Sequence, residues 1–294
     1  MTMSFARHQT FHIRTGWLRK GMRSIDIEPH IFLEDTADAM DMLGIGKNMI
    51  EALRYWMKAT KLAYEEYDNG IKVQKPTEIG ELIYDKDEYF EDIGTFWIIH
   101  YNLCQNKEKA TTWHWFFNHF RYNKFDENLF LSRLKNYIKR SGEDLPKDRS
   151  LRRDYRALIR TYEYDPESNI SPENTYESPF TDLKLLIKDN SEYKFNSPNT
   201  NVLPIKVFYY MLKDYVGDDK SINIDELLNG LNSPGRILGL NQTDLYKFLE
   251  KLENKNYVII SKQAGLNNLK LDGTSKGEIL EQYYKNKKAV IKHV

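Results

Sequence analysis

The residue types best suited to chemistry in this chain are carboxylates and histidines. The carboxylates of Glu78, Glu91 and Asp92 could supply the hard oxygen ligands that Mg²⁺ or Mn²⁺ takes in a nuclease. His8 or His100 could act as the general base that activates a nucleophile. Each group also has a plainer interpretation, because such carboxylates are typical of a solvated acidic surface and histidines of structural hydrogen bonding. The sequence contains no phosphate-binding glycine loop, zinc-ligand cysteine pair or nucleophile elbow.

A second kind of chemistry, the binding of phosphate, is indicated by cations that recur at helical spacing. Residues 149–162 form a predicted helix whose arginines lie roughly opposite Leu151, Tyr155 and Leu158. Arginine suits phosphate because its planar fork binds two oxygens at once. The alternative is that these arginines pair with acids such as Asp148 and Asp154. With Lys20 and polar residues of an earlier helix included, the candidate DNA-binding residues are Lys20, Lys47, Asn48, Arg54, Lys58, Arg149, Arg152, Arg153 and Arg156.

The earlier helix, residues 46–62, belongs to a segment with the layout of a winged helix-turn-helix. Residues 35–43 form the preceding predicted helix, and Gly44-Ile45-Gly46 is the turn, where glycine tolerates a positive φ. Residues 62–73 follow as two strand-like runs on either side of Asp68-Asn69-Gly70, a sequence suited to a tight hairpin. We expect the helix to seat its apolar stripe on a small core and to present cations to a DNA groove. A charged outer face is, however, also typical of any solvated surface helix.

The same order of elements is predicted twice more along the chain. Residues 126–140 and 149–162 form the helices of the second copy, and residues 222–228 and 243–254 form those of the third. Between the first and second copies, residues 95–120 are the most apolar stretch and are predicted as two core helices rich in aromatic rings. The expected fold class is therefore mainly α with small β hairpins, with tandem winged helix-turn-helix modules around a helical core.

Domain boundaries are indicated by two stretches rich in Ser, Asn, Glu and Pro. These predicted linkers cover residues 165–179 and 190–201. We predict an N-terminal winged helix-turn-helix at residues 1–92, a helical core with the basic arginine helix at 93–164, and a C-terminal winged-helix-like domain at 180–294.

Composition limits the class of protein. The 294 residues include 43 Lys and Arg and 43 Asp and Glu, so the formal net charge is +0. Proteins that coat nucleic acid indiscriminately usually carry a large basic excess, and any DNA binding is therefore expected to be local. The single cysteine, Cys104, excludes an internal disulfide and fits a reducing compartment. No segment approaches membrane-spanning length and no signal-peptide pattern is present, so we expect a cytoplasmic protein without a membrane partner.

Motifs spread over nearly the whole chain carry a resemblance to a known bacterial family. They include His8-Gln9-Thr10-Phe11, Gly16-Trp17-Leu18, Pro76-Thr77-Glu78-Ile79-Gly80, Gly94-Thr95-Phe96-Trp97 and Ser233-Pro234-Gly235-Arg236. On these motifs the chain resembles the SspB-type family of the Ssp systems, which place phosphorothioate links in one strand of DNA. The resemblance implies a DNA-binding nickase or targeting subunit in a modification and antiphage defence pathway. It implies as partners a cysteine desulfurase, a P-loop ATPase and an ATP-pyrophosphatase-like sulfur transferase, and it carries over no catalytic residues.

The basic helices and the resemblance agree on double-stranded DNA as the ligand. We therefore expect a DNA-binding protein of a phosphorothioation and antiphage defence system that nicks one DNA strand to allow sulfur insertion, with Mg²⁺ or Mn²⁺ as its cofactor. The alternative is a non-catalytic DNA-recognition adaptor that recruits the sulfur-transfer machinery. A transcriptional regulator is disfavoured because no sensor domain is recognisable. The sequence leaves a homodimer open.

Overall fold

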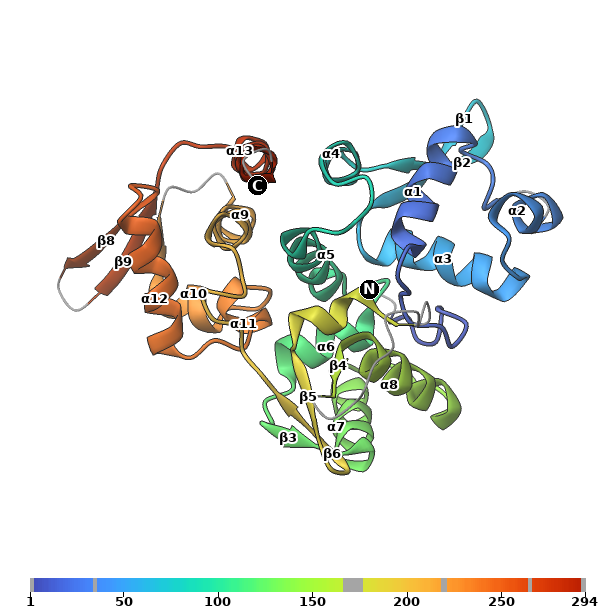
Figure 1. Ribbon diagram of the computed structural model, residues 1–294. Helices are drawn as coiled ribbons and strands as arrows, with labels where there is room; N and C mark the ends of the chain where they lie inside the picture. The colour runs from blue at the N-terminus through green and yellow to red at the C-terminus, as the bar shows by residue number, and fades with distance from the viewer. Residues whose placement is uncertain (1–2, 34–35, 166–176, 218–220, 264–265, 292–294) are drawn as a thin grey trace. The chain divides into compact units, whose positions relative to one another are not determined.

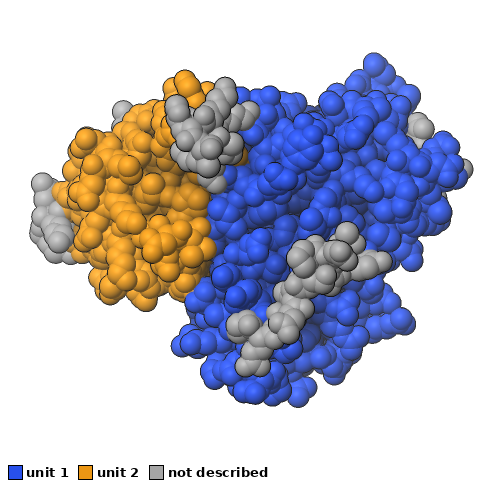
Figure 2. Space-filling view, in the orientation of Figure 1, with its two compact units in different colours: residues 1–196 blue, residues 197–294 orange. Residues whose placement is uncertain are grey.

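The computed structural model describes residues 3–33, 36–165, 177–217, 221–263 and 266–291. The chain divides into two compact units, Met1–Asn196 (unit 1) and Ser197–Val294 (unit 2), which are coloured separately in Figure 2. Helices dominate both units, and the strands form small sheets of two, four and three members among the described residues. None of the described helices is long and apolar enough to cross a membrane.

The first part of unit 1 consists of helices followed by a hairpin. In chain order the elements are α1 (Trp17–Ile27), α2 (Thr36–Leu43), α3 (Lys47–Ala59), β1 (Ala63–Asp68) and β2 (Ile71–Pro76) (Figure 1). Gly44 has a φ of 63° between α2 and α3, and Asn69 and Gly70 have φ values of 49° and 81° between the antiparallel strands. Positive φ at both central residues is what a type I′ hairpin turn requires. The predicted helices at 35–43 and 46–62 and the predicted hairpin are confirmed.

The apolar stripe of α3 holds this part together. Leu53, Trp56 and Met57 are fully buried. α1 packs closely on them, since a Cβ at Gly21 would overlap the sulfur of Met57. With its inner face fixed in this way, α3 keeps its polar residues on the opposite side of the helix.

The centre of unit 1 is the aromatic core predicted from residues 95–120. It contains α5 (Ile93–Gln105) and α6 (Thr111–His119), preceded by α4 (Glu78–Lys86). All residues from Gly94 to Cys104 on α5 and from Thr111 to Asn118 on α6 are buried. The rings meet edge to face, as in the pair of Phe116 and Phe117 with centroids 5.0 Å apart. The prediction of two core helices is confirmed.

The last part of unit 1 joins two helices to a small mixed sheet. Its elements are β3 (Lys124–Phe125), α7 (Glu127–Arg140), α8 (Asp148–Tyr162), β4 (Glu163–Tyr164), the 3₁₀ helix η1 (Pro179–Leu183), β5 (Leu186–Asp189) and β6 (Glu192–Phe195). The sheet order is β3-β6-β5-β4, with β4 parallel to β5 and the other pairs antiparallel. The predicted helices at 126–140 and 149–162 are confirmed. The predicted linker at 190–201 is wrong in its first half because β6 lies there, and most of the one at 165–179 lies outside the described residues.

Unit 2 builds helices around a separate sheet. Its elements are α9 (Ile205–Val216), β7 (Ser221–Asn223), α10 (Ile224–Asn229), α11 (Pro234–Ile237), α12 (Gln242–Glu253), β8 (Val258–Gln263), β9 (Leu266–Leu271) and α13 (Lys276–Ile291). The antiparallel sheet has the order β7-β9-β8. Phe208 of α9 stacks on Phe248 of α12 with ring centroids 4.5 Å apart. The predicted helices at 222–228 and 243–254 are confirmed, each with its ends displaced by one or two residues.

The fold is thus mainly helical with small sheets, as expected, while the assignment of its segments to winged helix-turn-helix modules stays a prediction. The predicted parts 1–92 and 93–164 both lie within unit 1. Residues 180–196, which the sequence assigned to the C-terminal domain, also belong to unit 1, because β5 and β6 pair with β3 and β4 there.

Candidate nucleic-acid interface

Residues 3–10, which we call the N-terminal segment, precede α1 and have no helix or strand; residues 7–10 form turns. Ala6, Gln9 and Thr10 have φ values of 53°, 49° and 75°. This left-handed region costs a non-glycine residue roughly 1–2 kcal/mol. Contacts elsewhere must hold the segment in this shape, and the backbone N–H of Ala6 makes one of them by donating to Asp154 Oδ1 at 2.7 Å.

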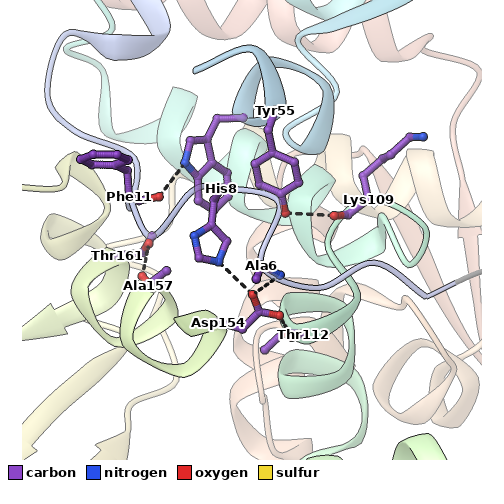
Figure 3. A network of polar contacts seen from close by, with 10 residues as sticks. Ala6, His8, Phe11, Tyr55, Lys109, Thr112, Asp154, Ala157 and Thr161 are labelled. Carbon is purple, nitrogen blue, oxygen red and sulfur yellow. Dashed lines mark hydrogen bonds and ion pairs between the residues drawn. The ribbon is translucent and has the colours of Figure 1, made fainter. Parts of the chain in front are cut away.

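Asp154 is the centre of a buried polar network on the inner side of α8 (Figure 3). Asp154 Oδ1 accepts from the Ala6 N–H and also lies 2.8 Å from His8 Nε2. The Thr112 hydroxyl donates to Asp154 Oδ2 at 2.5 Å. Asp154 is 2% exposed and His8 is 0% exposed. Several partners on one buried carboxylate offset the loss of its hydration. The network therefore ties the N-terminal segment to α6 and α8, and Asp154 is not a partner of the α8 arginines.

Aromatic rings enclose His8 on its other sides. The imidazole stacks on Trp56 with ring centroids 5.8 Å apart and meets Trp113 edge-on at the same distance. The Trp56 indole N–H donates to the carbonyl of Phe11 at 3.0 Å, which fixes the ring and the chain beyond the segment. Because His8 has no exposed surface, it positions the N-terminal segment and does not reach a phosphodiester in this conformation.

A pocket of ≈ 830 Å³ opens beside the N-terminal segment. Residues of α3, of α8 and of the turn between α5 and α6 form its other walls. Its cationic side chains are Arg7, Arg54, Lys58, Lys109 and Arg153. Two carboxylates, Glu51 and Glu108, also line it, so the five cations leave a net positive wall. Such a wall attracts anions, and phosphate is the anion for which arginine is best shaped.

Glu65 of β1 organises the cations at the α3 side of this pocket. Arg54 Nε lies 2.7 Å and Lys58 Nζ 2.6 Å from Glu65 Oε1, and Lys72 Nζ lies 2.7 Å from Glu65 Oε2. Burial opposes the charged form of Glu65, but these three donors outweigh it and lower its pKa to about 2. Burial also lowers the pKa of Lys58, against the opposing effect of Glu65. Glu65 carries one negative charge against three positive ones, so this group keeps a net positive charge that can attract an anionic ligand.

Comparison with family models matches residues 5–284 to a model described as a protein of unknown function (DUF4007). The chain belongs to the DUF4007 family. Two crystal structures of SspB are similar to this DUF4007 protein, each at 28% sequence identity over 96% of this chain and 88% of the other. The magnesium ion-bound one gives a TM-score of 0.84 and the other gives 0.83. Comparison with curated proteins gives no match.

The structure brings some of the predicted DNA-binding residues of the DUF4007 chain together. Arg54, Lys58 and Arg153 line one pocket, although Arg153 follows the other two by almost a third of the chain. On α8, Arg149 and Arg156 are exposed and have no ion-pair partner among the described residues. A phosphate backbone could therefore contact α8 at and beyond the pocket.

Other predicted DNA-binding residues lie outside the pocket. Lys47 and Asn48 are exposed at the first turn of α3. Arg152 pairs with Glu127 of α7, which is the structural alternative that the sequence left open for the arginine helix. Lys20 donates to the carbonyl of Leu43 at 2.7 Å, so it holds the end of α2 against α1.

His100, the other proposed general base, is buried on α5 in the aromatic core of unit 1. It is 0% exposed, its Nδ1 is 2.9 Å from the Tyr162 hydroxyl, and burial lowers its pKa to about 3. Burial likewise raises the pKa of the neighbouring Cys104 thiol. A neutral imidazole packed on Phe117, with centroids 4.6 Å apart, is a structural histidine in this conformation and has no path to DNA.

The structure does not bring the proposed metal ligands together. Glu78 begins α4, which rises roughly 12 Å from Glu78 to Lys86, and Glu91 and Asp92 come after the end of that helix. Asp92 caps α5 by accepting from the N–H of Gly94 at 2.7 Å. Within the described part of the chain, no three His, Cys, Asp or Glu side chains form a group that could hold a metal ion. Glu78, Glu91 and Asp92 therefore do not fit one magnesium site.

Several residues at or beside the pocket were not predicted as functional from the sequence. Arg7 and Lys109 line the pocket, and Asp154 anchors the segment beside it. Asp154 carries one signal in the sequence, because it is the acid on the apolar side of an arginine-rich helix. Arg7 and Lys109 carry none, since their place in the pocket depends on turns whose shape is set by contacts distant in sequence.

Proposed function

We propose that this DUF4007 protein is a DNA-binding component of an Ssp phosphorothioation and antiphage defence system. The observation that carries the proposal is the meeting of Arg54 and Lys58 from α3 with Arg153 from α8 at one pocket. Similarity to SspB over 96% of the chain supports the assignment to the Ssp system. The proposed partners are double-stranded DNA and the cysteine desulfurase, ATPase and sulfur transferase of such a system.

The charge distribution supports local contact with DNA. A formal net charge of +0 gives no general attraction to nucleic acid. The exposed Arg149 and Arg156 extend the positive pocket wall along α8, so phosphates could be bound at one place while the rest of the surface stays neutral.

The α2, α3, β1 and β2 segment has the element order of a winged helix-turn-helix, and we propose that it reads DNA. In that role α3 would place its first turn, with Lys47 and Asn48, at base edges in the major groove. An amide and a cation at this position can bind adenine or guanine edges. The cations further along α3 would then hold the phosphate backbone.

DNA binding is tested by fluorescence anisotropy with a labelled 25-base-pair duplex over a range of salt concentrations. We expect an Arg54→Ala, Arg153→Ala double variant to bind less tightly and to lower the slope of log K against log salt by about 0.9 for each phosphate that is no longer bound. Lys139→Ala, at an exposed cation on α7 outside the pocket, is the matched control. An unchanged slope in the double variant would remove these residues from the interface.

We propose nicking of one strand as the reaction, on the strength of the magnesium ion in one SspB structure. A divalent cation can stabilise both the attacking and the leaving oxygen of a phosphodiester. No residue of this chain is assigned to the metal. The alternative, a non-catalytic adaptor, is favoured by the burial of His8 and His100.

The nickase and the non-catalytic adaptor are distinguished by incubating the protein with supercoiled plasmid in Mg²⁺ or Mn²⁺, with and without a chelator. Open circles that form only with the metal support nicking. Tight binding that leaves the plasmid supercoiled, also after the partner proteins are added, supports the adaptor.

A further inference from the structure

The pocket beside the N-terminal segment contains more than cations. Met3, Phe5 and Tyr55 contribute apolar and aromatic surface to the same wall that carries arginines and lysines. Phe5 and Tyr55 are half-buried residues that line this pocket. Carboxylates on the wall, Glu51 and Glu108, can accept hydrogen bonds from amino groups. A phosphate alone would use only the cations, whereas this combination suits a ligand with an aromatic part, N–H donors and an anionic part.

The aromatic part of the wall is held rigidly. The Tyr55 hydroxyl donates to the carbonyl of Lys109 at 2.9 Å, and its ring meets Trp56 edge-on with centroids 4.9 Å apart. Burial and the nearby Asp154 raise the pKa of Tyr55 well above its usual value, so the phenol stays neutral. A neutral, fixed ring is a suitable platform for the flat face of a nucleobase.

The N-terminal segment is fixed as well. The N–H of Ser4 donates to Thr111 Oγ1 at 2.8 Å, and Gln9 Nε2 donates to Glu51 Oε2 at 2.6 Å. Together with the His8 and Asp154 contact, these bonds hold three left-handed residues in place. Strained backbone fixed from several sides is a feature of binding sites whose shape is set before the ligand arrives.

The volume of the pocket favours one nucleotide over a duplex. A volume of ≈ 830 Å³ lies within the range of about 300–1,000 Å³ that small-molecule pockets occupy. A duplex would instead lie across the exposed cations of α8, such as Arg149 and Arg156. Only a nucleotide that has left the base stack could enter between the segment and the helices.

We propose that this pocket takes a single unpaired nucleotide, with its base against Tyr55 and Phe5 and its phosphate on the neighbouring arginines. The ligand is either a nucleotide turned out of a DNA strand or a free nucleotide, which share this chemistry. The inference deepens the proposed function and rests on it for a DNA strand as the source.

The test uses the full-length protein and three probes in anisotropy and competition measurements. The probes are a fully paired 25-base-pair duplex, the same duplex with one unpaired adenosine at its centre, and deoxyadenosine monophosphate. We expect at least about tenfold tighter binding of the duplex with the unpaired base. Tyr55→Leu and Phe5→Ala should each remove most of that preference and leave binding of the paired duplex within about twofold.

Tyr64→Leu is the matched control, because Tyr64 is an exposed tyrosine on β1 that does not line the pocket. Should Tyr55→Leu fail to fold, Phe5→Ala, outside the helices and strands, carries the test alone. Binding of the monophosphate that is lost in Phe5→Ala, without a preference among duplexes, supports the pocket with a free nucleotide as ligand. Equal affinity for both duplexes and no binding of the monophosphate overturns the inference while DNA binding stands. Failure to bind either duplex, with the monophosphate still bound, overturns the proposed DNA function and leaves the nucleotide pocket in place.

Discussion

Replacement of Asp154 by alanine tests whether the buried network organises the interface. The carboxylate has three partners at 2.5–2.8 Å: the His8 ring, the Ala6 N–H and the Thr112 hydroxyl. A hydrogen bond to a charged group contributes about 1.5–3 kcal/mol, and loss of one member of a buried pair typically costs about 3–5 kcal/mol. The three contributions share one carboxylate and do not add in full. We therefore expect the free energy of unfolding to fall by about 3–5 kcal/mol.

The measurement is urea unfolding followed by tryptophan fluorescence, since Trp56 and Trp113 pack on His8. Asp154→Asn keeps the shape and one acceptor oxygen, so its loss of stability should be smaller than that of Asp154→Ala. Asp148→Ala, at an exposed acid of the same helix that pairs with Lys135, is the control and should change stability little. Equal, small losses for both alanine variants would refute the role given to the network. The Asp154 variants should also weaken DNA binding under conditions where they are folded, because the segment that lines the pocket loses its anchor.

Four further predictions concern charged and polar residues. Glu65→Gln should tighten DNA binding about tenfold, because Arg54 and Lys58 lose a competing anion; salt-dependent anisotropy checks this. A pKa of about 2 for Glu65 is below its usual value, so its stabilising effect is fully present above about pH 4.5 and is lost as the pH falls toward 2. The unfolding free energies of wild type and Glu65→Gln, measured in urea, should therefore converge at low pH, and a constant difference would contradict the assignment. Substitution of Asn48 by alanine should change the preference among DNA sequences by about 1–3 kcal/mol, whereas equal losses on all sequences would make it a phosphate-binding residue. Arg152→Ala should lower the salt slope less than a matched change at an unpaired arginine of α8, because its charge is already paired.

Local patterns predicted most of the helices, because apolar spacing and turn residues are short-range signals. The hairpin was predictable because both central residues of its turn need a positive φ, and Asn69 and Gly70 are of the few residue types that adopt it readily. β5 and β6 were missed because each is a strand of four residues with a mixed burial pattern. Their stability comes from pairing with β3 and β4, which lie elsewhere in the chain, and no local pattern reports it.

The candidate site was predictable only in part for the same reason. Helical spacing identified the cations of α3 and α8, and three of them share the pocket. Spacing could not show that Arg152 turns to Glu127 or that Asp154 turns to His8, since these pairings depend on how helices pack. The proposed metal ligands Glu78, Glu91 and Asp92 were chosen by residue type in one stretch of sequence, and in the described part of the chain they do not gather into a group that could hold a metal ion.

The pairing of cations with acids explains how a chain of zero net charge could bind DNA selectively. Arg54, Lys58 and Lys72 share Glu65, and Arg152 is paired with Glu127. If the chain binds DNA as proposed, a phosphate would have to displace these carboxylates. Glu65 lies 2.6–2.7 Å from its cations in a partly buried setting, so it attracts them more strongly than a distant, hydrated phosphate would. In the proposed complex, a phosphate in the pocket would meet Arg153 as well and would be bound by several donors at once, which would offset the loss of Glu65 as a partner. Weak binding to arbitrary DNA and tight binding at one geometry would then arise from the same set of residues. If Glu65→Gln tightened binding to every DNA equally and removed any preference for an unpaired nucleotide, Glu65 would be the residue that sets this selectivity.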